Sequence, residues 1–282
     1  MKIALDLMGS ETPTKTFKQA LQKQSKHFIL LGSKAVLKHF PTFEHIVTKS
    51  VVKMGDAPKD VLRHKQDSSM AIGLDLVKEK KAVAFISCGN TGAIAALSNS
   101  KLGKLKPFSR LGLLAHIPTK KKPLAIIDVG ANLYYDAKTL FEYGKLAARF
   151  QKYLFQLKKP KIALLNIGHE ATKGKQEQQK AYQLFSKKNA YFTFVGNIEG
   201  QDVFEGTIDV LVTDGFSGNI FLKTAEGVAN FLQSQYKFDL PSLAYGAIIC
   251  GVNGLVIKCH GKSKTQDLLG AFEKAKHLSA IF

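Results

Sequence analysis

Short apolar segments alternate with longer segments of helical periodicity along most of this 282-residue chain. The apolar segments are rich in Ile, Val, Leu and Phe, and several are apolar on both faces, as buried parallel strands are. We predict strands at residues 2–6, 28–32, 82–87, 111–117, 124–128, 162–166, 192–195, 208–213 and 255–259. The clearest helical segments are 68–80, 91–102, 138–154, 173–187, 218–236 and 264–278. This alternation predicts an α/β fold with a mainly parallel sheet.

No long linker rich in Pro, Ser or Gly interrupts this pattern, and we find no internal repeat. We therefore predict one domain over residues 1–282. The least regular stretch, 237–254, is expected to hold a loop and a small strand. Ser68 or Asp67 is a candidate N-cap, and Asn90 and Asn219 are candidates to begin helices.

Four predicted strands run into loops of Gly, Asn and Asp. Ligands bind outside the carboxyl ends of strands in open α/β sheets. Glycines in such loops let the backbone approach a ligand, and free N–H groups at helix starts attract anions such as phosphate. The pattern therefore predicts a polar, anion-binding cleft. The loops are CGNTG (88–92), DVGAN (128–132), NIGHEATKG (166–174) and TDGFSGN (213–219).

The formal net charge of +19 invites a nucleic-acid or membrane interpretation. Only Arg63, Arg110 and Arg149 are arginines, and the lysines are spread along the chain. Because base readout and bidentate phosphate contacts favour Arg, nucleic acid is not an expected partner. A solvated lysine-rich surface, an acidic protein partner and an anionic membrane remain as alternatives.

The composition argues against several other classes of protein. The chain is 45% hydrophobic, and no apolar run reaches the roughly 18–20 residues of a membrane span. The apolar segment at its start is too short for the apolar region of a signal peptide, so a cytoplasmic location is expected. Cys88, Cys250 and Cys259 form no C-x-x-C pair, so neither a disulfide framework nor a zinc cluster is expected. Cys88, at a strand end, is either a small packed residue or a reactive thiol.

Common catalytic motifs are also missing. The chain has no G-x-G-x-x-G, H-E-x-x-H or G-x-S-x-G motif, and a near match to a Walker A loop at 168–175 has the wrong spacing. Asp128 and Asp214 end strands, where they either cap the following helix or bind Mg²⁺. Among the lysines beside such strand ends, Lys173 is the strongest candidate to neutralise a phosphate or polarise a carbonyl. His260 is an acid, a base or a hydrogen-bonded core residue.

Taken together, the four loops of Gly, Asn and Asp at 88–92, 128–132, 166–174 and 213–219 resemble those of the bacterial phosphate acyltransferase (PlsX) family. The resemblance runs nearly from end to end, and the motifs occur in the family's order, which makes it specific. The closest is VTDGFSGNIFLKTAEG (212–227), beside MKIALDLMG (1–9), SCGNTGA (87–93), IDVGAN (127–132), NIGHEATKG (166–174), VGNIEGQD (195–202) and VIKCHG (256–261).

The resemblance implies transfer of a long-chain fatty acyl group from acyl carrier protein to inorganic phosphate, without cofactor or metal, on the path to phospholipid. It implies a three-layer α/β/α sandwich, Rossmann-like and similar to the isocitrate/isopropylmalate dehydrogenase architecture, and a homodimer. Lys173 and Asn219 are the expected catalytic residues. The expected substrate-binding residues are Asn90, Thr91, Gly92, Asn132, Asn166, Gly218 and His260.

The chain departs from the family pattern in two places. GSETP (9–13) replaces the family's G-G-D-H-A-P, and Val228–Ala244 replaces a longer helical insertion. Contacts that relatives make through these segments, including membrane or carrier-protein contacts, are therefore expected to differ. Three alternatives remain: a short-chain phosphotransacetylase using acyl-coenzyme A, a metal-dependent dehydrogenase of related architecture, and a basic membrane- or nucleic-acid-binding module.

Overall fold

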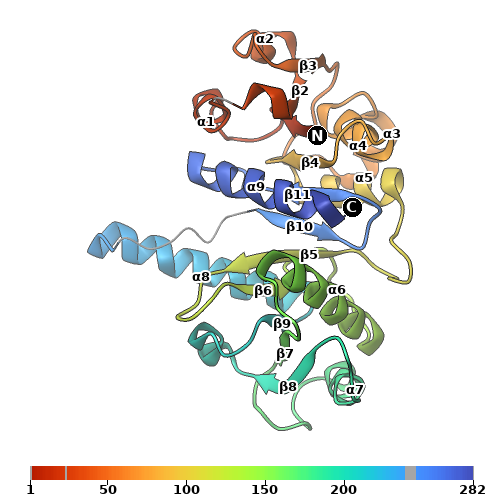
Figure 1. Ribbon diagram of the computed structural model, residues 1–282, viewed down its shortest axis with the longest axis vertical. Coiled ribbons are helices and arrows are strands. Elements are labelled where there is room, and N and C mark those ends of the chain that lie inside the picture. The colour runs from red at the N-terminus through yellow and green to blue at the C-terminus, as the bar shows by residue number, and fades with distance from the viewer. Residues whose placement is uncertain (1, 23, 239–245, 282) are drawn as a thin grey trace. The chain divides into compact units, whose positions relative to one another are not determined.

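The structure is a computed structural model that describes residues 2–22, 24–238 and 246–281. The chain divides into two compact units, Met1–Lys106 with Ala244–Phe282 (unit 1) and Pro107–Leu243 (unit 2). Figure 1 shows the elements of both units. The sequence-based expectation of a single domain stays a prediction.

The described part of unit 1 contains a mainly parallel sheet in the order β3-β2-β1-β4-β11-β10. Strands β1, β2, β3, β4 and β11 are parallel, and β10 runs antiparallel to β11. Every residue of β1, β2 and β4 is buried, which agrees with their predominantly apolar sequences. The strands are β1 Ile3–Asp6, β2 Phe28–Gly32, β3 Glu44–Val47, β4 Ala84–Ser87, β10 Ala247–Cys250 and β11 Leu255–Lys258.

Helices pack against this sheet in two groups. Helix α1 contacts α9, and α5 contacts both α3 and α4. The aromatic rings of Phe28 and Phe272 lie 4.6 Å apart, which joins β2 to α9 in the core. The helices of unit 1 are α1 Thr14–Ala20, α2 Lys34–Leu37, α3 Pro58–His64, α4 Ser69–Lys78, α5 Thr91–Leu102 and α9 Thr265–Leu278, with 3-10 turns at Ser25–His27 and Ser279–Ile281.

In the described part of unit 2, the strands follow the order β5-β6-β9-β7-β8. Strand β5 is antiparallel to β6, whereas β6, β9, β7 and β8 are parallel. The carboxyl ends of these four parallel strands therefore share one edge of the sheet. The strands are β5 Gly112–Ile117, β6 Leu124–Ile127, β7 Lys161–Leu165, β8 Thr193–Ile198 and β9 Val210–Val212.

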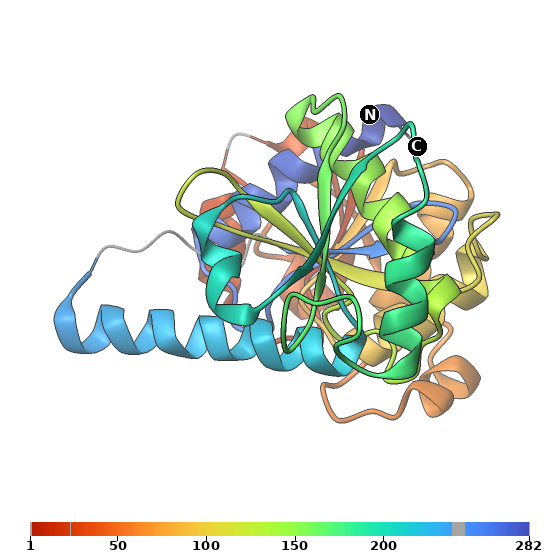
Figure 2. The same cartoon turned by 90° about the horizontal axis from the view of Figure 1, so that it is seen from below.

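Helices α6 Ala137–Phe155 and α7 Gln176–Phe185 contact each other and cover one face of this sheet. The 3-10 turn η2 Gly200–Glu205 and helix α8 Gly215–Tyr236 lie on the other face (Figure 2). Right-handed crossovers explain this, because β6-α6-β7 and β7-α7-β8 cross the sheet in one direction and β8-η2-β9 crosses in the other. The last buried side chain of α8 is Leu222, and the helix continues beyond it.

The predicted strands and the six predicted helices are all present, with boundaries within a few residues, and the α/β class with a mainly parallel sheet is confirmed. Ser68 caps α4, accepting a hydrogen bond from the Ala71 N–H, and Asn90 caps α5. The small strand expected in 237–254 is β10, while residues 239–245 lie outside the described residues. Strand β3 and the short helices α1, α2 and α3 were not predicted from the sequence.

Candidate active site

Asp128 organises the loop that follows strand β6. Its buried carboxylate accepts hydrogen bonds from the backbone N–H groups of Gly130, Ala131 and Asn132 at 3.1, 2.9 and 2.8 Å. A fourth N–H, from Leu113, donates to it at 3.0 Å. Burial raises the pKa of Asp128 above its ordinary value, and the hydrogen bonds oppose that effect. Because backbone groups already occupy the carboxylate, the structure favours a loop-shaping role for Asp128 over the Mg²⁺ alternative.

The side-chain amide of Asn132 completes this loop. Its Nδ2 donates to the Leu111 carbonyl oxygen at 2.6 Å, to Tyr143 Oη at 2.7 Å and to Asp128 Oδ2 at 3.1 Å. Tyr143 is buried, and its hydroxyl also donates to the Leu111 carbonyl oxygen. The amide hydrogens of Asn132 are therefore used to hold the loop. Its expected place in lining a substrate cleft stays a prediction.

Helix α8 begins at Gly215, with Asp214 as its N-cap. Asp214 Oδ1 accepts from the N–H groups of Phe216 and Ser217 at 3.0 and 2.9 Å, and Oδ2 accepts from the Ser217 hydroxyl at 2.8 Å. The prediction of Asp214 as a cap is thus confirmed. The suggestion that Asn219 begins this helix is wrong, because the Asp side chain satisfies the orphan N–H groups one turn earlier.

Gly218 lets helix α8 lie directly against the Asp128 loop. A Cβ at this position would be 2.0 Å from the Asp128 carbonyl oxygen and 2.7 Å from Cγ2 of Thr213. At the start of the same helix, the Gly215 N–H donates to the Asn132 carbonyl oxygen at 3.0 Å. Gly218, one of the expected site residues, therefore has a packing role that only glycine fills.

Asn219 follows Gly218 and is exposed at the first turns of α8. Its Oδ1 lies 3.4 Å from the position of a Cβ on Gly130, so it borders the Asp128 loop. Gly130 has φ +127°, in the region that favours glycine. Asn219 is therefore accessible to a substrate at this loop.

The loop between β7 and α7 holds Asn166 and Lys173. The buried Asn166 donates from Nδ2 to the Lys173 carbonyl oxygen at 3.1 Å and accepts from the Ile167 N–H at 2.9 Å. The Lys173 side chain is 46% exposed, and its Nζ lies 3.9 Å from Glu170 Oε1, a loose ion pair. Asn166 thus closes the loop, while the ammonium group of Lys173 remains accessible to an anion.

These loops lie side by side because their strands do. The loops 128–132, 213–219 and 166–174 follow β6, β9 and β7, which are neighbouring parallel strands. The structure therefore brings five of the expected site residues to one edge of the unit 2 sheet. They are Asn132, Asn166, Lys173, Gly218 and Asn219.

The other four expected residues lie at the carboxyl edge of the unit 1 sheet, after the neighbouring strands β4 and β11. Asn90 Oδ1 caps α5 by accepting from the Ala93 N–H at 3.0 Å. Asn90 Nδ2 donates to the carbonyl oxygens of Met54 at 2.8 Å and Asp56 at 3.0 Å. Asn90 thus fixes the 53–56 loop over this helix start, a contact that was not predicted from the sequence.

Thr91 and Gly92 are the first two residues of α5, and Gly92 is exposed. N–H groups at these positions have no intrahelical acceptor. Together with the positive end of the helix dipole, they suit an oxyanion.

His260 is exposed in the loop after β11, where its Nδ1 accepts from the Lys262 N–H at 3.2 Å. The GSETP segment (9–13), which differs from the family pattern, packs against this loop. Thr12 donates from its hydroxyl to the Gly261 carbonyl oxygen at 3.1 Å and accepts from the Ser263 N–H at 3.1 Å. The altered segment therefore supports the position of the His260 loop.

Asp6 lies beneath the 88–92 loop at the end of β1. Its carboxylate accepts from the Ser87 hydroxyl at 2.8 Å, and Ser87 in turn accepts from the Gly89 N–H at 3.0 Å. Burial raises the pKa of Asp6 from 3.8 to about 6, against the opposing effect of its hydrogen bonds.

We expect Asp6→Asn to gain stability over the native protein as pH rises. The unfolded carboxyl ionises near pH 3.8 and the folded one near 6, so native stability is highest below pH 3.8 and falls up to about pH 6. At 1.36 kcal/mol per pKa unit, the relative gain between pH 3.8 and 7.5 is about 3 kcal/mol. Urea unfolding across this range measures it, with the exposed Asp60→Asn as control. An equal difference at all pH values would contradict the expectation.

Cys88 is completely buried, which leaves its thiol inaccessible to a substrate.

Within residues 2–22, 24–238 and 246–281, no group of three or more His, Cys, Asp or Glu side chains is arranged to hold a metal ion.

Comparisons with known proteins identify the family. A family model described as "Fatty acid synthesis protein" matches residues 1–245. A phosphate acyltransferase of Dictyoglomus turgidum is 35% identical, covering 99% of this chain and 94% of its own. One of Chlamydia caviae is 37% identical, covering 95% and 92%. The chain belongs to the phosphate acyltransferase family. The predicted family is thereby confirmed, and with it the assignment of the chain as an acyltransferase.

Solved structures of lower similarity share the fold of this phosphate acyltransferase family member. A phosphotransacetylase from Streptococcus pyogenes aligns with TM-score 0.70 at 17% identity, covering 98% of this chain and 94% of that one. A 4-hydroxythreonine-4-phosphate dehydrogenase from Klebsiella pneumoniae aligns with TM-score 0.62 at 14% identity, covering 99% of each. At these identities the likeness concerns the fold alone, and it agrees with the expected dehydrogenase-like α/β architecture.

Proposed function

We propose that this protein transfers a long-chain fatty acyl group from acyl carrier protein to inorganic phosphate, giving acyl phosphate for phospholipid synthesis in the cytoplasm. The observation that carries the proposal is the near full-length match to phosphate acyltransferases. The loops after the parallel strands of each unit, which contain the motifs that resemble the family's, support it. A short-chain phosphotransacetylase is the second candidate, since it needs the same acceptor.

The reaction requires little covalent catalysis by the protein. A phosphate oxygen attacks the thioester carbon, the C–O bond forms, and the C–S bond breaks as the carrier thiolate leaves and takes up a proton. Holding the two substrates together and stabilising the tetrahedral oxyanion supply most of the rate enhancement. Within unit 2, we assign phosphate binding to the accessible ammonium of Lys173. The N–H groups of Thr91 and Gly92 at the start of α5 are the candidate oxyanion-binding groups of unit 1. Asn219 stabilises the oxyanion.

Incubation with palmitoyl-acyl carrier protein and phosphate, followed by hydroxylamine trapping, tests the function. We expect palmitoyl hydroxamate only when phosphate is present. Palmitoyl- and acetyl-coenzyme A as donors distinguish the second candidate. Product from acetyl-coenzyme A alone would replace the first proposal with the second, and no phosphate-dependent product from any donor would reject both.

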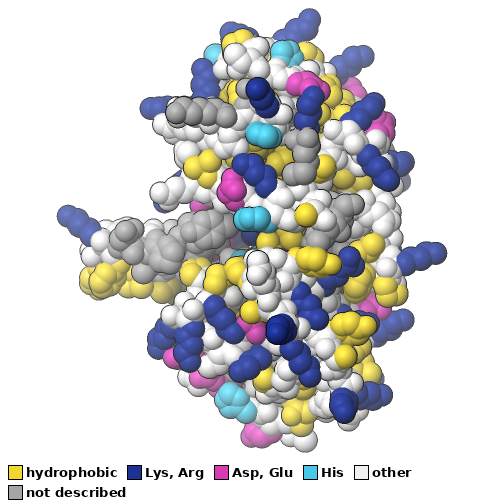
Figure 3. Space-filling view, in the orientation of Figure 1, with side chains coloured by type: hydrophobic (Ala, Val, Ile, Leu, Met, Phe, Trp, Pro, Cys, Tyr) yellow, Lys and Arg dark blue, Asp and Glu magenta, His cyan; other side chains and the backbone are white. Residues whose placement is uncertain are grey.

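The charge of the protein supports an acidic partner such as acyl carrier protein. Lys and Arg side chains are scattered over the face seen in Figure 3, and the net charge is +19. Attraction between oppositely charged proteins speeds their association, and salt screens this attraction. We expect kcat/KM for the carrier substrate to fall about tenfold or more between roughly 0.05 and 0.5 M NaCl. The matched coenzyme A thioester controls for effects of salt on the chemistry, and an equal decline for both donors would argue against electrostatic docking.

Peripheral contact with an anionic membrane is a further part of the proposal, since each nearby Lys or Arg contributes roughly 1 kcal/mol of attraction. None of the helices formed by the described residues is long and apolar enough to span a bilayer. Co-sedimentation with phosphatidylserine vesicles at low salt tests the contact. Recovery of all protein in the supernatant would reject it.

We further propose a homodimer that forms through helix α8. Its outer stripe consists of Phe216, Ile220 and Phe231, which are 60%, 49% and 56% exposed. Hydrophobic side chains lie along this helix in Figure 3, and exposed apolar side chains that gather on a surface mark interaction sites. We expect a dimer in sedimentation velocity and a monomer for Phe231→Glu, with Asn230→Glu as control. A monomeric native protein at micromolar concentration would contradict this.

A further inference from the structure

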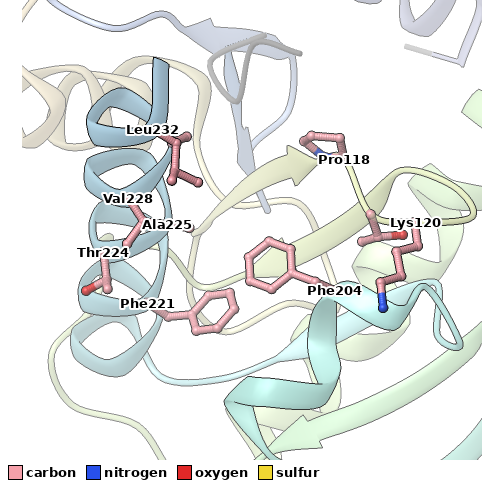
Figure 4. A pocket seen from close by; sticks show the side chains of 10 residues that line it. Pro118, Lys120, Phe204, Phe221, Thr224, Ala225, Val228 and Leu232 are labelled. Atoms are coloured by element: carbon pink, nitrogen blue, oxygen red, sulfur yellow. The ribbon is translucent and has the colours of Figure 1, made fainter. Parts of the chain in front are cut away.

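A pocket of about 570 Å³ lies on the sheet-facing flank of helix α8, within unit 2. Its size is within the roughly 300–1,000 Å³ of small-molecule sites. The walls come from α8, from η2 and from the 118–120 turn after β5, and Figure 4 shows their side chains. We call it the α8 pocket, and its main lining residues are Phe204, Phe221, Ala225, Val228, Ala229 and Leu232.

The α8 pocket is apolar and elongated. The rings of Phe204 and Phe221 stack with centroids 5.8 Å apart, and both side chains project into the space between their elements (Figure 4). From Phe221 to Leu232 the wall follows α8 for about 16 Å, at 1.5 Å per residue. Ala225 and Ala229 keep the middle of this wall open because their side chains are small. Lys120 is the charged lining residue, and Glu205 pairs with it at 2.6 Å.

One end of the pocket adjoins the loop of Lys173. Phe221 lies 3.7 Å from the position of a Cβ on Gly200, the first residue of η2. The two acidic residues nearest to Gly200 in sequence, Glu199 and Asp202, lie 3.8 and 3.4 Å from His169 Nε2. His169 belongs to the 166–174 loop. A molecule in the pocket therefore begins beside the candidate catalytic loop and extends away from it along α8.

We propose that the α8 pocket binds the alkyl chain of the acyl substrate and sets the preferred chain length. The proposal rests on the proposed function, which requires a substrate with a long apolar tail. An unbranched alkyl chain fits an elongated apolar pocket whose charged lining residue, Lys120, is paired with Glu205. The pocket also lies on a different side of α8 from the outer stripe, because Phe221, Ala225 and Leu232 follow each other at helical spacing.

The test fills the pocket. Ala229→Phe places a ring in its middle, and Asn230→Phe adds the same ring to an exposed position one residue away. The readout is kcat/KM with acyl carrier protein donors of 8 and 16 carbons. Burying one CH₂ is worth about fourfold in affinity, so loss of a few methylenes from the pocket gives a large change. We expect the preference for 16 over 8 carbons to fall at least tenfold in Ala229→Phe and to stay unchanged in Asn230→Phe.

Binding of radiolabelled palmitate, measured by equilibrium dialysis, separates this inference from the proposed function. Binding by the native protein that Ala229→Phe weakens at least tenfold supports the pocket even if no acyl phosphate is formed. An active native protein whose folded Ala229→Phe and milder Ala225→Leu variants keep the native chain-length preference would overturn the inference. So would a change in sedimentation without a change in chain-length preference, because the pocket would then belong to a protein interface. Absence of palmitate binding to the native protein would also overturn it.

Discussion

Replacing Lys173 or Asn219 by Ala is expected to lower kcat about 10²–10³-fold while the protein stays folded. Loss of one preorganised donor to a developing oxyanion typically has this effect. Both side chains are accessible, so neither replacement removes a buried contact. Rates of phosphate-dependent hydroxamate formation measure kcat, and the dependence on phosphate separates the two roles. Lys173→Ala should also raise KM for phosphate, whereas Asn219→Ala should act mainly on kcat.

Two control variants accompany this experiment. Lys187→Ala removes an exposed lysine elsewhere in unit 2, and Asn230→Ala removes an exposed asparagine from the same helix as Asn219. Both should retain near-native activity. If Lys173→Ala and Asn219→Ala, shown to be folded by circular dichroism, work as well as these controls, the assignment of catalytic residues is wrong.

Gly218→Ala is expected to cause the largest loss of stability. The added Cβ would meet the Asp128 carbonyl oxygen at 2.0 Å, and this backbone atom cannot rotate away as a flexible side chain can. Either α8 or the Asp128 loop must shift, at a cost of about 3 kcal/mol or more. For a chain of this size we expect Tm to fall by about 6 °C or more, with loss of activity.

The same helix contains a matched control. Gly227 has no atom within 4 Å of the position that an added Cβ would take, and it lies at an exposed site. Gly227→Ala should therefore raise stability by up to about 1 kcal/mol, because Ala is the better helix former. Thermal unfolding of the two variants compares identical chemical changes in different surroundings. Equal Tm values for Gly218→Ala and the native protein would refute the packing role of Gly218.

Long apolar strands and their loops were predictable because their signals are local. Strand β4 is a continuous apolar run, and the α5 N-cap Asn90 directly precedes a helical pattern. The order of the motifs then identified the family from the sequence alone. The same reasoning failed for β3, where only Ile46 of Glu44–Val47 is even partly buried, so the strand carries almost no apolar signal.

Contacts between distant segments were not predictable. Nothing in the sequence indicates that Asn90 donates to carbonyls of the 53–56 loop, or that Asn132 reaches the hydroxyl of Tyr143. The start of α8 was misplaced because a Gly and an aromatic residue follow Asp214, a weak helical pattern that the cap outweighs. The positions of Lys173, Asn219, Asn90, Thr91, Gly92 and His260 at strand ends followed from the sequence, but their catalytic roles stay predictions.

The uneven burial of α8 bears on how this protein can change over evolution. Its first two turns are fixed against the Asp128 loop, whereas none of the described side chains of this helix after Leu222 is buried. Insertions or deletions after that point leave the loops at the strand ends untouched. The length of the segment after α8 can therefore drift between lineages, and a longer segment from a relative should be transplantable here without loss of the fold.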